Sequence, residues 1–357
     1  MQNLSFIQNI RDIIGMLEDD LSKEIYLARL NWLVTGDYKY VEEIVTKSHP
    51  GLPVWNRADE REFLNILPFN KKIIFYGAGS FSERLIPYLK DIAENIEFCD
   101  GNVEKQKRGF FGHRVMSPDD LFKIDTEKVV VICTTKYMDE VEQFLMKNGI
   151  HKEELIDIRP FFLCGTGDEY FYEDFLKYEE NEIFIDAGSY DLATTMEFKK
   201  VCNGLRKAYV FEPDSVNYAR CLNRIESDNA YLPEVVMYPC GTWSSKAELN
   251  FASTANGASH IGEGEVVINT LAIDETVDKN DKITFIKMDV EGAELESLKG
   301  AAKTIKRCRP KLAICIYHKP EDMYTLPLYI KSLVPEYKFY LRSYSNAYHE
   351  MVLYAVI

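Results

Sequence analysis

The sequence contains no apolar run near the roughly 20 residues that a membrane-spanning helix needs. Its first 20 residues mix acidic and basic side chains with apolar ones, unlike a secretory signal. Positive charge is scarce, since 42 Lys and Arg stand against 57 Asp and Glu and the formal net charge is -15. Because binding to a nucleic-acid backbone requires clustered cations, we expect no nucleic-acid partner. From the lack of a long apolar run and of a secretory signal, we expect no membrane span and a cytoplasmic location.

Paired cysteine motifs are also missing. The eight cysteines occur without a Cys-x-x-Cys pair, and several lie inside apolar, strand-like runs. This pattern predicts reduced core residues and excludes both a disulfide framework and a zinc site of the usual spacing.

A chain of 357 residues with 46% hydrophobic content is long enough for two domains. In residues 1–66 the apolar side chains recur every three or four positions, which predicts a helical N-terminal segment. His49, Pro50 and Gly51 interrupt that series. We expect this segment to be a cap or a dimerisation element, so a homo-oligomer is one alternative.

Residues 67–163 alternate strand-like and helical patterns. Short apolar runs at 73–76, 96–99 and 129–133 are separated by helical stretches, which predicts a small parallel βαβ sheet of the Rossmann-like kind. Residues 164–180 are small, polar or aromatic and acidic, so we place the linker to the next domain there.

Residues 181–357 repeat the alternation on a larger scale. The strand-like runs are 183–186, 208–211, 235–238, 283–289 and 312–317, followed by 337–341 and 351–357, which a loop joins. Five βα units closed by a hairpin-like pair predict a doubly wound α/β sheet.

Polar residues follow the first two strands of this second domain. The first strand runs into Asp186-Ala-Gly188-Ser-Tyr190-Asp191, and glycine at such a turn lets the backbone approach a ligand closely. The second strand ends in Glu212, 26 positions after Asp186. An acidic side chain there can accept hydrogen bonds from both ribose hydroxyls of an adenosyl group. These five numbered residues are the candidate cofactor-binding residues.

The densest motif is Lys287-Met-Asp289-Val-Glu291-Gly-Ala-Glu294-Leu295. Its three carboxylates lie at the end of an apolar strand and in the first turn of the next helix, where the helix dipole favours negative charge. Glu291 and Glu294 can therefore be ordinary helix-start residues, whereas Asp289 lies at the strand's carboxyl end, where ligands bind.

Together, D-x-G at 186–188, F-E-P at 211–213 and K-M-D-V-E-G-A-E-L at 287–295 are similar to the hallmark stretches of FkbM-type methyltransferases. The resemblance covers about half of the chain. It implies a class I methyltransferase fold that uses S-adenosylmethionine, usually to O-methylate sugars, glycans or specialised metabolites. The expected partner is a small-molecule or glycan substrate.

Transfer of a methyl group from a sulfonium to a hydroxyl requires alignment of the reactants and a base for the hydroxyl proton. The candidate catalytic residues are Asp289, Glu291 and His318, which follows the run 312–317; Asp289 is also a candidate for cofactor binding. No Asp-Asn companion follows the acidic motif, so we expect a site without a metal.

One position departs from the family pattern. Leu192 stands where the second glycine of the first motif is usual, and a bulky side chain in that turn would narrow the pocket for the methionine part of the donor. This departure keeps a non-catalytic scaffold or nucleotide-sugar-binding protein open as an alternative.

The first domain has a glycine turn of its own. Gly77 and Gly79 follow its first strand, and Asp100 ends the next strand, 23 positions after Gly77. This spacing suits a bound nucleotide, with the acidic residue on the ribose. We expect the domain to help recognise a nucleotide-linked sugar, with an empty structural fold and a nicotinamide-dependent oxidoreductase as the alternatives.

Overall fold

The computed structural model describes residues 2–37, 39–50, 63–89, 96–134, 138–158, 169–202, 204–227, 234–252, 260–261, 266–345 and 349–357. The chain divides into two compact units, and we describe each by itself. Unit 1 comprises residues 1–50 and 165–357, and unit 2 comprises residues 51–164. Residues 164–168 of the predicted linker lie outside the described residues.

Unit 2 is built on a five-stranded sheet with the order β3-β2-β1-β4-β5, in which every pair is parallel. Its strands are β1 (Lys72–Tyr76), β2 (Ile96–Cys99), β3 (Val115–Met116), β4 (Lys128–Ile132) and β5 (Leu155–Asp157). Its described helices are α5 (Ser80–Leu89), α6 (Val103–Arg108), α7 (Pro118–Leu121), α8 (Met138–Lys147) and the short η2 (Lys152–Glu154). The predicted parallel sheet is therefore present, and β1 lies at its centre.

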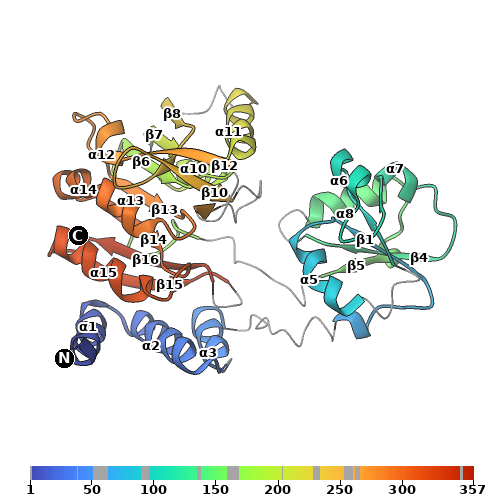
Figure 1. The fold of residues 1–357 in the computed structure, drawn as a ribbon, viewed down its shortest axis with the longest axis horizontal. Coiled ribbons are helices and arrows are strands. Elements are labelled where there is room, and N and C mark those ends of the chain that lie inside the picture. The colour runs from blue at the N-terminus through green and yellow to red at the C-terminus, as the bar shows by residue number, and fades with distance from the viewer. Residues whose placement is uncertain are drawn as a thin grey trace. The chain divides into compact units, whose positions relative to one another are not determined.

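The main sheet of unit 1 has seven strands in the order β15-β16-β14-β13-β6-β7-β8 (Figure 1). They are β6 (Glu182–Ala187), β7 (Leu205–Phe211), β8 (Glu234–Tyr238), β13 (Phe285–Met288), β14 (Lys311–Cys315), β15 (Lys338–Ser343) and β16 (Met351–Val356). Strands β14, β13, β6, β7 and β8 run parallel to one another, and β16 is antiparallel to both β14 and β15. The predicted doubly wound α/β sheet with a closing hairpin is confirmed.

The central strands of this sheet are buried on both faces. Alternate residues of β6 point to opposite sides: Ile183 and Ile185 join one hydrophobic cluster, and Phe184 joins another. A strand covered by helices on both faces is nearly continuously apolar, which explains why these strands were readable from the sequence.

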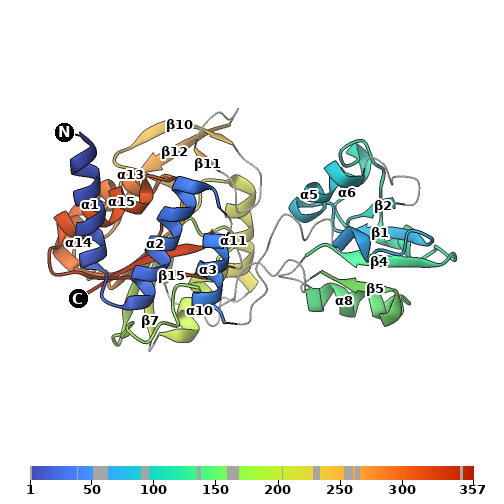
Figure 2. The same ribbon diagram turned by 90° about the horizontal axis from the view of Figure 1, so that it is seen from below.

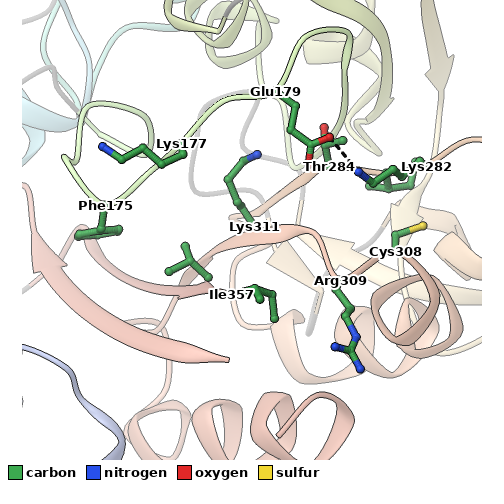
Figure 3. Close-up of a pocket in the computed structure, with 11 residues that line it drawn as sticks. Phe175, Lys177, Glu179, Lys282, Thr284, Cys308, Arg309, Lys311 and Ile357 are labelled. Atoms are coloured by element: carbon green, nitrogen blue, oxygen red, sulfur yellow. Dashed lines mark hydrogen bonds and ion pairs between the residues drawn. The ribbon is translucent and has the colours of Figure 1, made fainter. Parts of the chain in front are cut away.

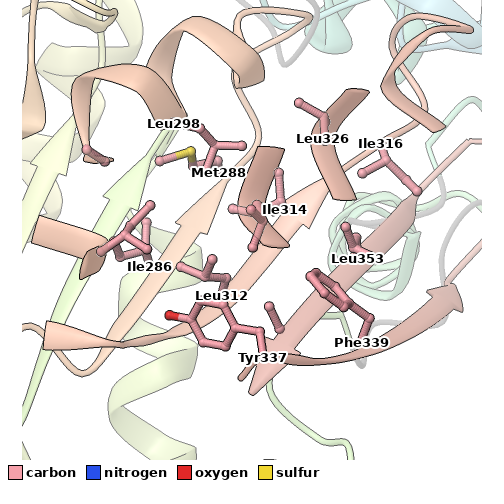
Figure 4. Packing of buried hydrophobic residues seen from close by; sticks show 14 of the residues in the cluster. Ile286, Met288, Leu298, Leu312, Ile314, Ile316, Leu326, Tyr337, Phe339 and Leu353 are labelled. Carbon is pink, nitrogen blue, oxygen red and sulfur yellow. The ribbon is translucent and has the colours of Figure 1, made fainter. Parts of the chain in front are cut away.

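The helices that follow the strands are α10 (Ala193–Val201), α11 (Ser215–Ser227), α12 (Ile273–Thr276), α13 (Glu294–Gly300), α14 (Ala302–Cys308) and α15 (Asp322–Leu333). Leu298 of α13 and Leu326 of α15 pack with Ile314 of β14 on one face of the sheet (Figure 4). On the other face, Phe198 of α10 stacks on Phe184 with ring centroids 4.4 Å apart. The winding thus places helices on both sides of the parallel strands.

Three N-terminal helices belong to unit 1: α1 (Gln2–Met16), α2 (Asp20–Thr35) and α3 (Lys39–Ser48). Helices α2 and α3 lie beside β15 at the edge of the sheet, and α1 lies beside α15, as Figure 1 and Figure 2 show. Ser22 accepts a hydrogen bond from the Leu341 backbone N–H at 2.9 Å, and Arg342 forks onto the Asp19 carboxylate at 2.6 and 3.3 Å. Polar contacts therefore fix the start of α2 on a strand that follows it by about 300 residues.

A second, four-stranded sheet lies between β8 and β13 in the chain, and the sequence patterns did not predict it. It comprises β9 (Gly241–Thr242), β10 (Ala247–Ala252), β11 (His260–Ile261) and β12 (Val266–Leu271), in the order β11-β10-β12-β9. Two of these strands are only two residues long, which is too short for a recognisable alternation of apolar and polar residues.

Two expectations from composition can be set beside the structure. Within the described part of the chain, every helix is too short or too polar to cross a bilayer. The seven cysteines that the structure describes are free thiols, and all except the half-buried Cys308 are buried. The eighth, Cys164, lies outside the described residues.

Candidate functional site

The main sheet reverses its winding direction between β6 and β13. From β6 the chain proceeds to β7 and β8 on one side, and β13 and β14 continue on the other side. At such a switch point the loops at the carboxyl ends diverge and leave a crevice where ligands bind in open α/β sheets. Asp186 lies within β6, and the other predicted cofactor and catalytic residues of this unit follow β6, β7, β13 and β14.

The loops after β6 and β13 contact each other closely. Gly188 has φ +81°, and a Cβ atom built on it would lie 1.9 Å from the backbone oxygen of Asp289. The Asp289 N–H also donates to the Ala187 carbonyl at 3.1 Å. Glycine is required at 188 both for its conformation and for this approach.

Asp186 is fully buried beneath the turn. Its Oδ2 accepts hydrogen bonds from the hydroxyls of Ser189 at 2.9 Å and Thr195 at 2.8 Å. Its Oδ1 lies 3.3 Å from Nζ of Lys287, which itself donates to the Gly188 carbonyl at 2.6 Å. These contacts engage the Asp186 carboxylate in shaping the loop.

Glu212 follows β7 and reaches the same turn. Its Oε2 accepts the Tyr190 backbone N–H at 2.8 Å, and its Oε1 accepts that of Asp214 at 2.9 Å. The residue is 5% exposed, and burial raises the pKa of its carboxyl, opposed by the two backbone hydrogen bonds. Since a carboxylate has about four acceptor positions, the two oxygens retain capacity for a ligand.

Asp191 acts at the start of α10. Its Oδ1 accepts the Ala193 backbone N–H at 3.0 Å, and its Oδ2 lies 3.7 Å from the Arg224 guanidinium. The structure therefore brings Gly188, Tyr190 and Glu212 together at the turn and gives Asp191 a capping contact beside them.

Leu192 adopts φ +67°, a left-handed conformation that the glycine usual in the family would adopt without steric strain. Its side chain is 0% exposed and belongs to a cluster with Ala208, Val210 and Cys221. The bulky side chain thus packs into the core between β7 and α11. The sequence-based reason for doubting a donor pocket is therefore removed.

Asp289, Glu291 and His318 converge after β13 and β14. The Nε2 atom of His318 lies 3.5 Å from Asp289 Oδ1 and 3.4 Å from Glu291 Oε2. Glu291 is held in a left-handed conformation with φ 52°, which costs free energy for a non-glycine residue and is common at functional sites. The three candidate catalytic residues thus form one cluster.

Glu294 supports this cluster from beneath. It is 0% exposed, and its Oε1 lies 2.9 Å from His318 Nδ1 while accepting the Val290 backbone N–H at 3.1 Å. Burial lowers the pKa of His318, but Glu294, Asp289 and Glu291 together outweigh this effect and raise that pKa to about 9. Burial is also the main reason why the pKa of Glu291 is raised to about 7.

Further residues lie around the cluster, and local sequence patterns did not predict them. The Tyr170 hydroxyl donates to Asp289 Oδ2 at 3.1 Å across 119 positions of the chain, and Tyr317 donates to Glu350 Oε2 at 3.3 Å. Burial raises the pKa of Glu350 to about 8. Lys287 carried a usable signal, because a charged residue inside the apolar strand β13 must find a buried partner.

The glycine turn of unit 2 repeats part of this arrangement. Gly77 has φ +111°, whereas a Cβ atom at Gly79 would meet no atom within 4 Å. Asp100 accepts the Ala78 backbone N–H at 2.9 Å and pairs with Nζ of Lys105 at 2.9 Å. Its other oxygen accepts the Asn102 N–H at 2.9 Å, so the carboxylate is bound to its own loop on both sides.

A pocket of about 190 Å³ lies elsewhere in unit 1 (Figure 3). Lys282 and Thr284, which precede β13, and Lys311, which begins β14, line it together with Arg309. It is therefore at the amino ends of the strands, at the other end of the sheet from the cluster. Lys282 forms an ion pair with Glu179 at 2.8 Å, and Lys311 with Glu182 at 3.0 Å.

The sequence matches a known domain over this region. Residues 184–345 match the model of the methyltransferase FkbM domain, from within β6 to beyond the end of β15. The chain carries an FkbM methyltransferase domain. All the candidate residues of unit 1 lie inside the matched range, as does Glu294.

Two similar proteins extend this comparison. Hexuronic acid methyltransferase AglP of Haloferax volcanii is 29% identical over 134 residues, which are 36% of this chain and 53% of that protein. The chain thus spans about half the length of the curated relative that it matches. The crystal structure of methyltransferase FkbM from Methylobacillus flagellatus KT aligns with a TM-score of 0.50 and 18% identity, covering 94% of this chain and 99% of that one. This likeness supports the fold of the FkbM domain.

Proposed function

We propose that this chain transfers a methyl group from S-adenosylmethionine to a hydroxyl of a sugar, glycan or related metabolite. The FkbM domain implies use of this donor. The observation that carries the proposal is the convergence at the carboxyl ends of β6, β7, β13 and β14. A glycine turn, a buried acidic residue and a three-residue cluster of polar side chains meet there at the switch point of the sheet.

The turn after β6 and Glu212 suit the adenosyl part of the donor. Gly188 keeps the loop close to Asp289, and backbone N–H groups orient the Glu212 carboxylate while leaving acceptor capacity for two ribose hydroxyls. We assign Asp186 a positioning role, because its oxygens contact Ser189, Thr195 and Lys287.

The sulfonium supplies the methyl group, and its sulfur keeps the electron pair of the broken carbon–sulfur bond. The side chains of Asp289 and Glu291 are 24% and 26% exposed, so both are accessible to an acceptor from solvent. We propose that they orient the acceptor hydroxyl and receive its proton as the new carbon–oxygen bond forms. The Tyr170 hydroxyl holds Asp289 in place, and His318 lies between the two carboxylates.

We infer the chemical class of the acceptor from a similar protein. The name of hexuronic acid methyltransferase AglP supports a carbohydrate acceptor, and its identity of 29% over part of the chain does not extend to a particular sugar. We further propose that the glycine turn of unit 2, after β1, helps to recognise a nucleotide-linked form of the acceptor. The free thiols of the described cysteines support a cytoplasmic location.

Titration calorimetry of the full chain with S-adenosylhomocysteine tests the donor site. We expect micromolar binding that Glu212→Ala weakens by about 100-fold. The control is Glu234→Ala, at the opposite end of the sheet, where the side chain is 64% exposed and pairs with Lys207. Absence of binding to the wild type, or equal binding by the Glu212 variant, would reject the donor assignment.

A screen with isotope-labelled donor then tests the acceptor. Free sugars, hexuronic acids and their nucleotide-linked forms are compared, with mass spectrometry to locate the added methyl group. Methylation of the nucleotide-linked sugars in preference to the free sugars supports the role of unit 2. Equal rates with both would remove that role and leave the transferase in place.

A further inference from the structure

The cluster of Asp289, Glu291 and His318 has the composition and spacing of a cation site. One possible ligand atom from each residue lies within 4.8 Å of the others. Two carboxylate oxygens and one imidazole nitrogen form a set of ligands that is known for divalent cations. A cluster of carboxylates without the imidazole would be weaker evidence for a cation site.

The atoms that face the centre of this cluster lack hydrogen bonds. His318 is 9% exposed, and among the described residues no group forms a hydrogen bond to its Nε2 or to Asp289 Oδ1. Buried polar atoms of native proteins are usually satisfied, so atoms left open on facing side chains point to a missing ligand. His318 Nε2 lies 3.4 Å from the Glu291 carboxylate and 3.5 Å from the Asp289 carboxylate, so it binds neither of them tightly.

The groups behind these ligands are arranged as they are in metal sites. The second nitrogen of His318, Nδ1, lies 2.9 Å from Oε1 of the buried Glu294. The second oxygen of Asp289, Oδ2, accepts the Tyr170 hydroxyl at 3.1 Å. A metal-bound histidine typically directs its other nitrogen to a carboxylate, which fixes the tautomer and turns Nε2 toward the metal. Glu294 therefore has a use that its position at a helix start does not require.

We propose that Asp289, Glu291 and His318 bind a divalent cation such as Mn²⁺. The role of the cation in catalysis rests on the proposed function, whereas the cation site itself rests only on the geometry of the three side chains. Three protein ligands leave coordination positions for water and for oxygens of the acceptor. A cation there polarises the acceptor hydroxyl, whose proton passes to a carboxylate oxygen of Asp289 or Glu291 that does not bind the cation, and it favours acceptors with two adjacent oxygen donors. The sequence favoured a metal-free site because no Asp-Asn companion follows the acidic motif. The third ligand, His318, instead follows the next strand of the sheet, β14.

Electron paramagnetic resonance tests the site on the full chain after removal of metals with a chelator. Mn²⁺ is titrated without any methyl donor, and loss of the free-ion signal reports binding. We expect one bound Mn²⁺ per chain, at least tenfold weaker binding in Asp289→Asn and Glu291→Gln, and nitrogen coupling to the bound ion that His318→Gln removes. The matched control is Glu296→Gln on α13, whose carboxylate pairs with Lys299 outside the cluster and which should bind Mn²⁺ as the wild type does.

Calorimetric titration of the same samples with S-adenosylhomocysteine separates the two proposals. Variants that bind it normally but lose Mn²⁺ support the cation site and show that the fold is intact. Mn²⁺ binding without S-adenosylhomocysteine binding would support the cation site and reject the donor assignment. A wild type that binds S-adenosylhomocysteine but neither Mn²⁺ nor Zn²⁺, or binding without nitrogen coupling, would overturn the cation site.

Discussion

The sheet of unit 2 and the main sheet of unit 1 share a loop arrangement and differ in the residues that surround it. In each, a glycine turn follows a central strand, and an acidic residue at the end of the neighbouring strand accepts a backbone N–H from that turn: Asp100 from Ala78, and Glu212 from Tyr190. Asp100 is additionally neutralised by Lys105. Glu212 is more deeply buried, and the loops after β13 and β14, on the other side of β6, add Asp289, Glu291 and His318.

This difference teaches that a glycine turn followed by an acidic residue specifies a type of loop closure and not a reaction. The chemistry of unit 1 depends on what the strands on the other side of the switch point contribute.

The largest effect is expected for His318→Gln in the FkbM domain. Losing the group between Asp289 and Glu291 should slow methyl transfer by about 1,000-fold, within the range seen when a proton-transfer or electrostatic group is removed. Binding of S-adenosylhomocysteine should change by less than about threefold, since Glu212 and the turn are untouched. The rate is measured with the acceptor from the screen; an unchanged rate would remove the cluster from the mechanism.

The glycines of the two turns should differ in their tolerance of alanine. Gly188→Ala should destabilise unit 1 by about 3 kcal/mol, because its φ is positive and the added Cβ would meet the Asp289 backbone. Gly79→Ala should change the stability of unit 2 by less than about 0.5 kcal/mol, since no atom lies near its Cβ position. Thermal melts followed by hydrogen exchange assign each loss to its unit; equal effects would contradict the contrast.

The acidic residues should differ in their effect on the donor. Glu212→Ala should weaken S-adenosylhomocysteine binding by about 100-fold, which corresponds to two hydrogen bonds to a charged group. Asp100→Ala should leave this affinity unchanged and is the matched variant. A similar loss in both variants would mean that the donor does not reside in unit 1 alone.

Leu192→Gly tests whether that side chain limits the donor pocket. The variant relieves the left-handed backbone by about 1 kcal/mol but removes a fully buried side chain, so we expect a net loss of about 2 kcal/mol of unfolding free energy. Donor affinity should stay the same. Tighter binding in this variant would show that Leu192 narrows the pocket after all.

The smallest effect is expected at the N-terminal helices. Hydrogen bonds from Arg342 and Ser22 outweigh the opposing effect of burial and hold the pKa of Asp19 below its ordinary value. Asp19→Asn should therefore cost about 1 kcal/mol at neutral pH. A lowered folded-state pKa stabilises the fold above the ordinary aspartate pKa of about 3.9, and this stabilisation is lost as the pH falls through the folded-state value. Urea unfolding at a series of pH values should show the two proteins converging in acid; a constant difference would assign the effect to packing.

Local patterns determined much of this protein. Continuous apolar runs marked the parallel strands, since a strand covered on both faces has no polar side. The positions after those strands located the turn at Gly188, Glu212 and the acidic motif at Asp289, because residues at carboxyl ends share one edge of a parallel sheet.

Tertiary structure decided the rest, because the deciding contacts join residues that are far apart in the chain. Folding brings Tyr170 to Asp289 and His318 to Glu294, and it places α2 and α3 on β15. It also turns Leu192 into the core, although its position in the motif suggested an obstructed pocket. Composition and spacing determine which strands form and where their loops lie, whereas the direction and partners of each side chain depend on the packing of distant segments.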